Sequence, residues 1–191
     1  MMDRKAGPSL ADKQRWLKHY YFFRAAFSVI WVGLAFAVGH LSPGIAAVLL
    51  VAYPAWDALA NYIDMSRSGG SFENRTQATN VFVSLAVTVG VIVALRVSMA
   101  GVLGIFGLWA ILSGLLQLST AVHRWKAFGA QWAMILSGAQ SALAGGFFIM
   151  QAHAPAPNAI VKVAGYAAVG AIYFLVAATW LSVTGMRRKV A

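Results

Sequence analysis

Residues 53–80 read YPAWDALANYIDMSRSGGSFENRTQATN. This stretch holds three of the five acidic residues in a chain of 191 residues. Its first polar side chains are spaced by four, four and three, so that they share one helix face: Tyr53, Asp57, Asn61 and Asp64. Beyond a pair of glycines, a second polar face follows: Gln77, Asn80, Ser84 and Thr88. We therefore expect a polar site between two neighbouring helices.

The overall composition predicts an integral membrane protein. Hydrophobic residues make up 60% of the chain and charged residues only 10%, whereas soluble domains carry about 25% charged residues. The mean hydropathy is +0.71. The chain has no cysteine, which excludes disulfides, thiol chemistry and cysteine-ligated zinc sites.

Six apolar runs of roughly the 20 residues that cross a bilayer follow one another along the chain. They lie at about 20–40, 43–64, 77–95, 98–121, 128–150 and 159–184. Residues 1–19 are polar and basic and predict a cytoplasmic helix, and residues 185–191 predict a basic tail. The expected fold is all-α, a polytopic bundle of six transmembrane helices in which short turns make successive helices antiparallel neighbours.

The distribution of positive charge predicts the orientation in the membrane. The net charge is +10, and the basic residues gather near the two termini and in the second and fourth turns. Only Arg96 and Lys162 fall on the other side. The positive-inside rule then places both termini in the cytoplasm. Anionic lipid headgroups, rather than nucleic acid, are the expected partners of this charge, and a homo-oligomer in the bilayer is compatible with it.

An internal repeat predicts how the spans are paired. A shift of 57 residues superposes matching residues of the first two pairs of spans: Gly33 on Gly90, Gly44 on Gly101, and Arg67 on Arg124. The last pair fits more loosely, so the implied unit is a two-helix hairpin repeated three times in the same orientation. The same shift places Gly114 opposite Asp57, so the acid is peculiar to the first hairpin.

Small and polar residues in the later spans indicate further contacts. Two runs of small residues at spacings of three and four predict close helix packing: Gly101, Gly104 and Gly107, and Ser137, Ser141 and Gly145. Weaker polar faces occur on spans four and five: Ser113, Gln117 and Thr120, and Ser137 and Gln140.

Asp57 lies well inside the second span and needs a partner or a proton. An unpaired acid at the bilayer centre costs about 2.5–3.5 kcal/mol. Arg24, at a similar depth in the first span, is the natural partner in a structural ion pair, and a proton-coupled or substrate-facing role is the alternative. Pro54 should free the carbonyl of Leu50 from its helical bond. The candidate intramembrane site comprises Arg24, Tyr53, Asp57, Asn61, Asp64, Gln77, Asn80 and Ser84.

The sequence offers no pattern typical of an enzyme or a metal protein. All four histidines fall at span ends without metal-ligand spacing: His19, His40, His123 and His153. The motifs of serine hydrolases, zinc peptidases, P-loop proteins and dinucleotide-binding proteins are missing from the sequence. We therefore expect no enzymatic activity, no catalytic residues, no cofactor and no metal.

Two phrases carry a resemblance to a known family. Residues 53–70 followed by NRTQATN, and residues 107–146, GLWAILSGLLQLSTAVHRWKAFGAQWAMILSGAQSALAGG, resemble the HdeD-like membrane proteins with short repeats. The second phrase has Gly114, Arg124, Trp132 and Gly138 in the matching places. The resemblance implies a bacterial protein with six spans in the inner membrane, in a family of which some members are linked to acid resistance. It brings no catalytic residues with it.

The functional expectation combines these observations. The leading hypothesis is a non-enzymatic inner-membrane protein that acts in acid or envelope stress protection. One alternative is a small-solute or proton-coupled transport or channel protein that uses the Asp57 face. Another is a membrane anchor that holds a cytoplasmic partner through the basic N-terminal helix.

Overall fold

The computed structural model describes residues 10–67, 75–153 and 158–190, and the regular elements in these ranges are all helices. They are α1 (Leu10–Leu34) with its π-helical continuation η1 (Ala35–Gly39), α2 (Pro43–Arg67), α3 (Arg75–Ala94), α4 (Met99–Arg124), α5 (Gln131–Gln151) and α6 (Ala159–Val190). Within these described ranges, six helices are long and apolar enough to cross a membrane. The predicted all-α polytopic fold with six membrane-spanning helices is confirmed.

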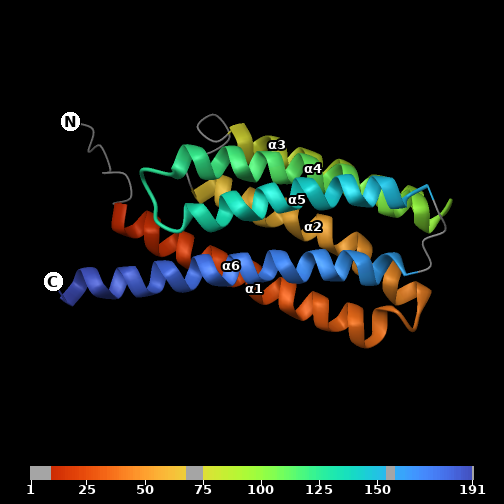
Figure 1. Ribbon diagram of the computed structural model, residues 1–191, viewed down its shortest axis with the longest axis horizontal. Coiled ribbons are helices and arrows are strands. Elements are labelled where there is room, and N and C mark those ends of the chain that lie inside the picture. The colour runs from red at the N-terminus through yellow and green to blue at the C-terminus, as the bar shows by residue number, and fades with distance from the viewer. Residues whose placement is uncertain (1–9, 68–74, 154–157, 191) are drawn as a thin grey trace, which may run out of the picture.

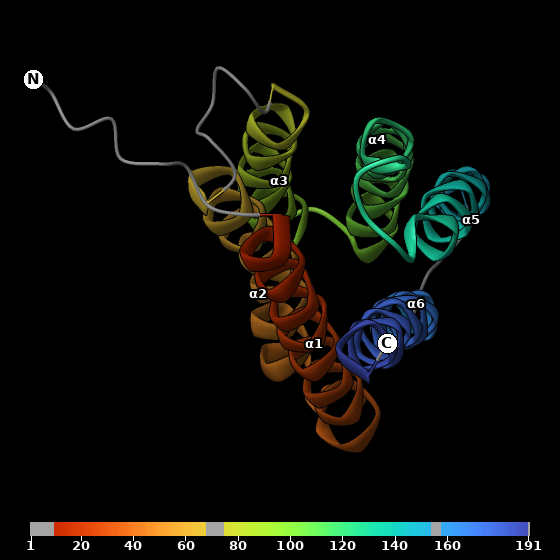
Figure 2. The ribbon, with the colours of Figure 1, turned by 90° about the vertical axis from the view of Figure 1, so that its left-hand side faces the viewer.

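The six helices run side by side and close into a ring. Figure 1 shows them lying along one direction, with the start of α1 and the end of α6 at the same end of the bundle. Seen along the bundle, they follow one another in chain order, and α6 returns beside α1 (Figure 2). All six helices contribute side chains to a cavity inside this ring.

Neighbouring helices pack to different extents. The most extensive contact joins α4 to α5, followed by α1 with α6 and α2 with α3. The backbones of α1 and α2 lie further apart, and these two helices meet through side chains, as Phe27 and Trp56 do at 4.3 Å between ring centroids. On α6, aromatic side chains of α1 pack against Phe174 and against small residues such as Ala177 and Ala178. The rings of Tyr21 and Phe174 lie 5.8 Å apart between centroids. The three-fold repeat of hairpins stays a prediction.

Local signals explain where several helices begin. The Ser98 side chain caps α4 by accepting a hydrogen bond from the Gly101 amide at 3.0 Å. α5 begins at Gln131, three residues later than the predicted span, because Ala130 has a left-handed backbone with φ of 64°. α1 runs unbroken from Leu10 into the first span, and α6 continues to Val190, so helix extends into both of the predicted flanking segments.

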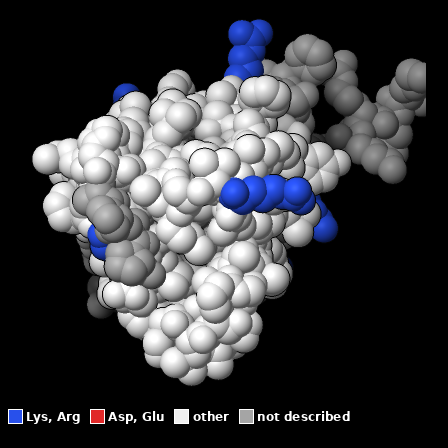
Figure 3. All heavy atoms as spheres, turned by 90° about the vertical axis from the view of Figure 1, so that its right-hand side faces the viewer, with Lys and Arg blue, Asp and Glu red and all other residues white. Residues whose placement is uncertain are grey.

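The bundle has two chemically different halves. The half towards Gly39, Pro43 and Gln151, here called the apolar half, holds a large hydrophobic core. Its most deeply buried side chains include Leu50, Val91, Leu103, Phe106 and Val163. Figure 3 looks onto the end of this half and shows a few scattered basic side chains and no acidic ones among the described residues. The opposite half, here called the termini half, holds the polar stretch.

Pro54 lies buried inside α2, as expected for a proline within a membrane helix. The indole nitrogen of Trp31 donates to the carbonyl of Leu49 at 2.8 Å. Pro54 has no N–H and should leave the Leu50 carbonyl without its helical bond. The carbonyl that Trp31 reaches belongs instead to the preceding residue, Leu49. This bond ties α1 to α2 in the apolar half.

Four glycines let α4 and α5 approach backbone to backbone. A Cβ added at Gly114 would lie 2.6 Å from the Gly138 carbonyl oxygen, and one added at Gly145 would lie 2.4 Å from that of Gly107. Such distances leave no room for a side chain, which confirms the predicted small-residue contact at Gly107 and Gly145. A Cβ added at Gly104 would lie 3.4 Å from the side chain of Ala152, at the end of α5, whereas one at Gly101 would meet Ser98 and Ala94. Two of the three glycines at spacing three therefore face α5.

Candidate functional site

A polar cavity of about 90 Å³ lies inside the ring of helices. Side chains from all six helices line it, for example Tyr20 on α1, Asp57 on α2, Asn80 on α3, Gln117 on α4, Gln140 on α5 and Tyr166 on α6. The lining begins at the helix ends of the termini half and reaches Tyr53, Trp109 and Ser141, close to the middle of their helices. Beyond that point the apolar core fills the bundle.

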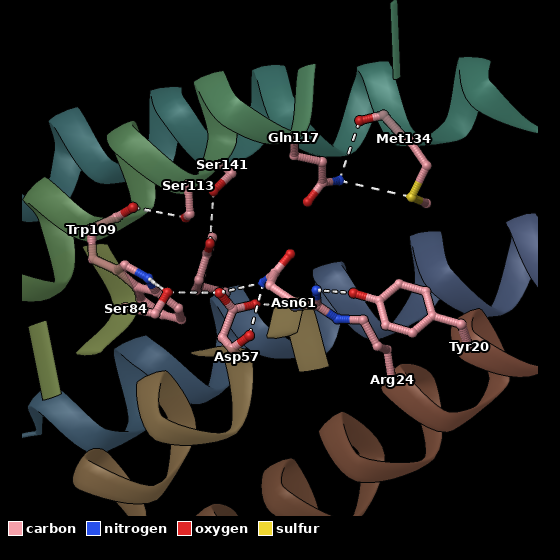
Figure 4. Close-up of polar contacts among 11 residues, drawn as sticks. Tyr20, Arg24, Asp57, Asn61, Ser84, Trp109, Ser113, Gln117, Met134 and Ser141 are labelled. Carbon is pink, nitrogen blue, oxygen red and sulfur yellow. Dashed lines mark hydrogen bonds and ion pairs between the residues drawn. The ribbon is translucent and has the colours of Figure 1, made fainter. Parts of the chain in front are cut away.

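Asp57 is the centre of the first group of polar contacts in the wall. Its Oδ1 is paired with the guanidinium of Arg24, so the predicted Arg24–Asp57 ion pair is present. Its Oδ2 accepts hydrogen bonds from Asn61 Nδ2 at 3.0 Å and from Ser84 Oγ at 2.8 Å (Figure 4). Asp57 itself is only 5% exposed. The buried carboxylate is thus neutralised and hydrogen-bonded on both oxygens, as a buried charge requires.

Ser84 connects Asp57 to a third helix. The hydroxyl that donates to Asp57 also accepts the indole N–H of Trp109 at 3.0 Å. Ser84 is completely buried, and it joins α2, α3 and α4 at the boundary between the polar and apolar halves. Its position behind Asp57 explains why it supports the cavity wall without lining it.

Arg24 is held by aromatic rings as well as by its carboxylate. It donates to the Tyr20 hydroxyl at 3.1 Å. Its guanidinium carbon lies 4.5 Å from the centre of the Phe174 ring on α6, a distance at which the negative face of the ring attracts a cation. These contacts fix Arg24 between α1, α2 and α6.

Asp64 is the centre of a second group, nearer the helix ends of the termini half. Its Oδ2 accepts from Arg124 at 2.9 Å and from Gln77 Nε2 at 3.3 Å. Its Oδ1 accepts from the indole of Trp16 at 3.4 Å, and the Arg67 guanidinium lies 5.1 Å from the Trp16 ring centre. This group joins α1, α2, α3 and α4, and it forms the rim of the cavity wall.

Two buried polar atoms in cavity-lining residues are left without a hydrogen bond in the described part of the chain. They are Oδ1 of Asn80, whose residue is 8% exposed, and Nε1 of Trp56. An unsatisfied buried donor or acceptor costs about 1–3 kcal/mol. Native structures keep few of them, and functional sites are one of the places where they occur.

The structure brings nearly all of the predicted site residues together. Seven of the eight line the cavity, and Ser84 contacts Asp57 from behind. The weaker polar faces of spans four and five also line it: Ser113, Gln117, Thr120, Ser137 and Gln140. Thr88, on the same face as Ser84, instead donates to the Ser84 carbonyl of its own helix at 2.7 Å and lies outside the cavity wall.

The sequence did not identify several residues that form or contact the cavity wall. Arg124 is 60 residues from Asp64, and no spacing rule links the two. Trp16 and Trp109 donate to the polar groups through their indole nitrogens, a role that no spacing in the sequence indicates. Tyr166 shares a hydrogen bond of 2.7 Å with Ser141. In the sequence, the only indication for Tyr166 is a phenol group within an otherwise apolar run.

Most polar groups of this site are neutral hydrogen-bonding groups. Within the ranges that the structure describes, no three histidine, aspartate or glutamate side chains gather as a metal site. Nδ1 of His19 and of His123 each lies 2.8 Å from a carbonyl of its own helix, away from the cavity. What the wall offers is a set of hydroxyl, amide, phenol and indole groups that can bind a polar molecule through hydrogen bonds.

Comparison with known proteins gives no further information: no family model matches the chain, and no match occurs among curated proteins or solved structures. The HdeD-like family therefore stays a prediction from the two sequence phrases, and the functional argument rests on the cavity.

Proposed function

We propose that this integral membrane protein is non-enzymatic and passes a small polar solute across the membrane through its central cavity. The observation that carries the proposal is the polar cavity itself, enclosed by six membrane-spanning helices. Polar side chains inside a membrane are costly and usually mark a substrate or ion pathway. Here the ring of helices screens them from lipid and turns them towards one shared space.

The shape of the site supports a pathway with one open side and one closed side. Polar lining reaches the helix ends at Arg124 and Gln131. In the other direction Leu50, Phe106 and Val163 close the bundle with apolar side chains that are almost fully buried. By the positive-inside rule the termini half faces the cytoplasm, which in a bacterial inner membrane makes this an inward-facing arrangement.

The proposal can be tested by filling the cavity. Ser113 on α4 lines it, and a Ser113→Phe variant should abolish protein-dependent solute entry into proteoliposomes. Ser119 lies on the same helix outside the cavity lining, so Ser119→Phe is the matched control and should transport normally. Unchanged flux in Ser113→Phe, or no protein-dependent flux in the unmodified protein, would contradict the proposal.

A second candidate is a structural membrane protein without a solute. It is favoured by the complete pairing of Asp57, whose oxygens are occupied by Arg24, Asn61 and Ser84. A role in acid or envelope stress, as the HdeD-like resemblance implies, belongs to this candidate.

The anchor hypothesis rests on the exposed basic residues at the start of α1, such as Lys13 and Arg15, and it has no support from the cavity.

A further inference from the structure

The charges in the cavity wall cancel. Of the lining residues, two are cationic and two anionic: Arg24, Arg124, Asp57 and Asp64. Each cation is paired with an anion, Arg24 with Asp57 and Arg124 with Asp64. An ion that entered this space would lose its water shell without meeting a free counter-charge, and that loss is costly in a low-dielectric interior.

The two carboxylates have little capacity left to bind a cation. Every oxygen of Asp57 and of Asp64 already accepts at least one hydrogen bond, and one oxygen of each contacts an arginine. A cation in the cavity would have to displace these partners before it could bind either carboxylate.

The neutral polar groups of the wall suit an uncharged ligand rather than an ion. Asn80 Oδ1 is an acceptor and Trp56 Nε1 is a donor, and neither has a partner in the described part of the protein. The hydroxyl and amide groups that line the cavity both donate and accept hydrogen bonds, so a neutral ligand with donors and acceptors of its own, such as a hydroxyl or a primary amide, matches them. Gln140 and Ser113 add further amide and hydroxyl groups to the same wall.

The size of the cavity limits the ligand to a small molecule. Its volume of about 90 Å³ is several times the roughly 10–15 Å³ that a single buried water needs. We infer that the cavity selects small uncharged solutes with both hydrogen-bond donors and acceptors, of the polyol or amide class, and rejects ions and zwitterions. This inference rests on the proposed function and names its substrate class.

The test compares solutes of similar size and different charge in proteoliposomes. Vesicle swelling, measured by light scattering against protein-free vesicles, reports entry of glycerol and urea as uncharged solutes and of glycine and potassium formate as charged ones. Sucrose serves as a solute too large for the cavity. We expect protein-dependent entry of glycerol and urea alone.

Variants tie the selectivity to the wall. Asn80→Leu removes an amide group from the cavity wall on α3, and we expect protein-dependent glycerol entry to fall about fivefold, the effect of one net hydrogen bond. Gln140→Leu on α5 is a second, independent variant with the same expected direction. Thr79→Val changes an exposed neighbour that bonds its own helix at Arg75, and it should leave entry unchanged. Thermal unfolding in detergent identifies any variant that fails to fold.

The outcomes separate the two proposals. Entry of glycine or formate as fast as glycerol would overturn the inferred selectivity while leaving a solute pathway in place. Glycerol entry that survives both Asn80→Leu and Gln140→Leu would also overturn it. No protein-dependent entry of any solute would contradict the proposed function, and the inferred substrate class would fail with it.

Discussion

The two halves of the bundle differ in what occupies the centre of the ring of six helices. In the apolar half, side chains such as Leu103 and Phe106 fill the centre and are fully buried. In the termini half, paired charges and hydrogen-bonding groups surround a cavity of about 90 Å³. The same helices pass through both halves, so the difference lies in side chains rather than in backbone architecture. One half closes the bundle, and the other half provides a place to bind.

The largest effect should come from breaking the ion pair of the termini half. Asp57→Ala leaves Arg24 buried without a counter-charge, and we expect a loss of about 3–5 kcal/mol in the free energy of unfolding. SDS titration of the protein in mixed micelles measures it. The control is the double variant Arg24→Met with Asp57→Leu, which removes both charges and should unfold less easily than Asp57→Ala. Equal losses in the two variants would show that the pair is not the source of stability.

The next effect concerns a contact that both halves share. Gly145→Ala places a Cβ 2.4 Å from the carbonyl oxygen of Gly107 in the apolar half. Gly114→Ala places a Cβ 2.6 Å from the carbonyl oxygen of Gly138 in the termini half. Overpacking should cost each variant about 1–3 kcal/mol of unfolding free energy. Gly146→Ala, with no atom within 4 Å of its added Cβ, is the matched control. A large loss in only one of the first two variants would mean that the halves also differ in backbone packing.

A smaller effect is expected at the boundary between the halves. Ser84→Ala removes a donor to Asp57 and the acceptor of the Trp109 indole. The expected loss is about 1–2 kcal/mol, because a buried hydrogen bond contributes roughly 1 kcal/mol. Ser182, which donates only to the carbonyl of Ala178 in its own helix, gives the control Ser182→Ala. Equal unfolding free energies for the two variants would contradict a linking role for Ser84.

The smallest effect lies at the rim of the termini half. Arg67 is exposed, and its guanidinium lies 5.1 Å from the Trp16 ring centre. Arg67→Ala should lower the unfolding free energy by about 0.5–1 kcal/mol, the usual contribution of an exposed cation–π contact. Arg67→Lys keeps the positive charge and should lose less. If Arg67→Lys loses as much as Arg67→Ala, the contact depends on guanidinium geometry rather than on charge.

The sequence predicted the helices well because each span is a continuous apolar run of the required length. It also predicted the two polar faces around Asp57, since helical spacing places side chains on a face without knowledge of the neighbours. The Arg24–Asp57 pair followed from similar depth in successive spans. Spacing within one helix is the information that a single sequence holds most directly.

The sequence could not predict how the ring of helices closes. Short turns indicated that α1 and α2 are neighbours, and the Arg24–Asp57 pair joins them, but nothing local showed that α1 also packs on α6, at the far end of the chain. The pairing of Asp64 with Arg124 depends on that ring and has no local signal. The donors Trp16 and Trp109 were hidden for the same reason. In a membrane an indole is typical of the lipid interface, and only the three-dimensional neighbours show that these two serve the polar groups.

The difference between the halves can be measured most directly by the chemical reactivity of introduced thiols. The chain has no cysteine, so Ser113→Cys in the cavity wall and Val163→Cys in the apolar core each provide a single thiol. Iodoacetamide is a small uncharged amide of the class inferred to enter the cavity. In folded protein it should alkylate Ser113→Cys at least about tenfold faster than Val163→Cys, because thiol reactivity follows access. Similar rates at the two positions, whether both fast or both slow, would contradict a solute-accessible termini half closed by an apolar half.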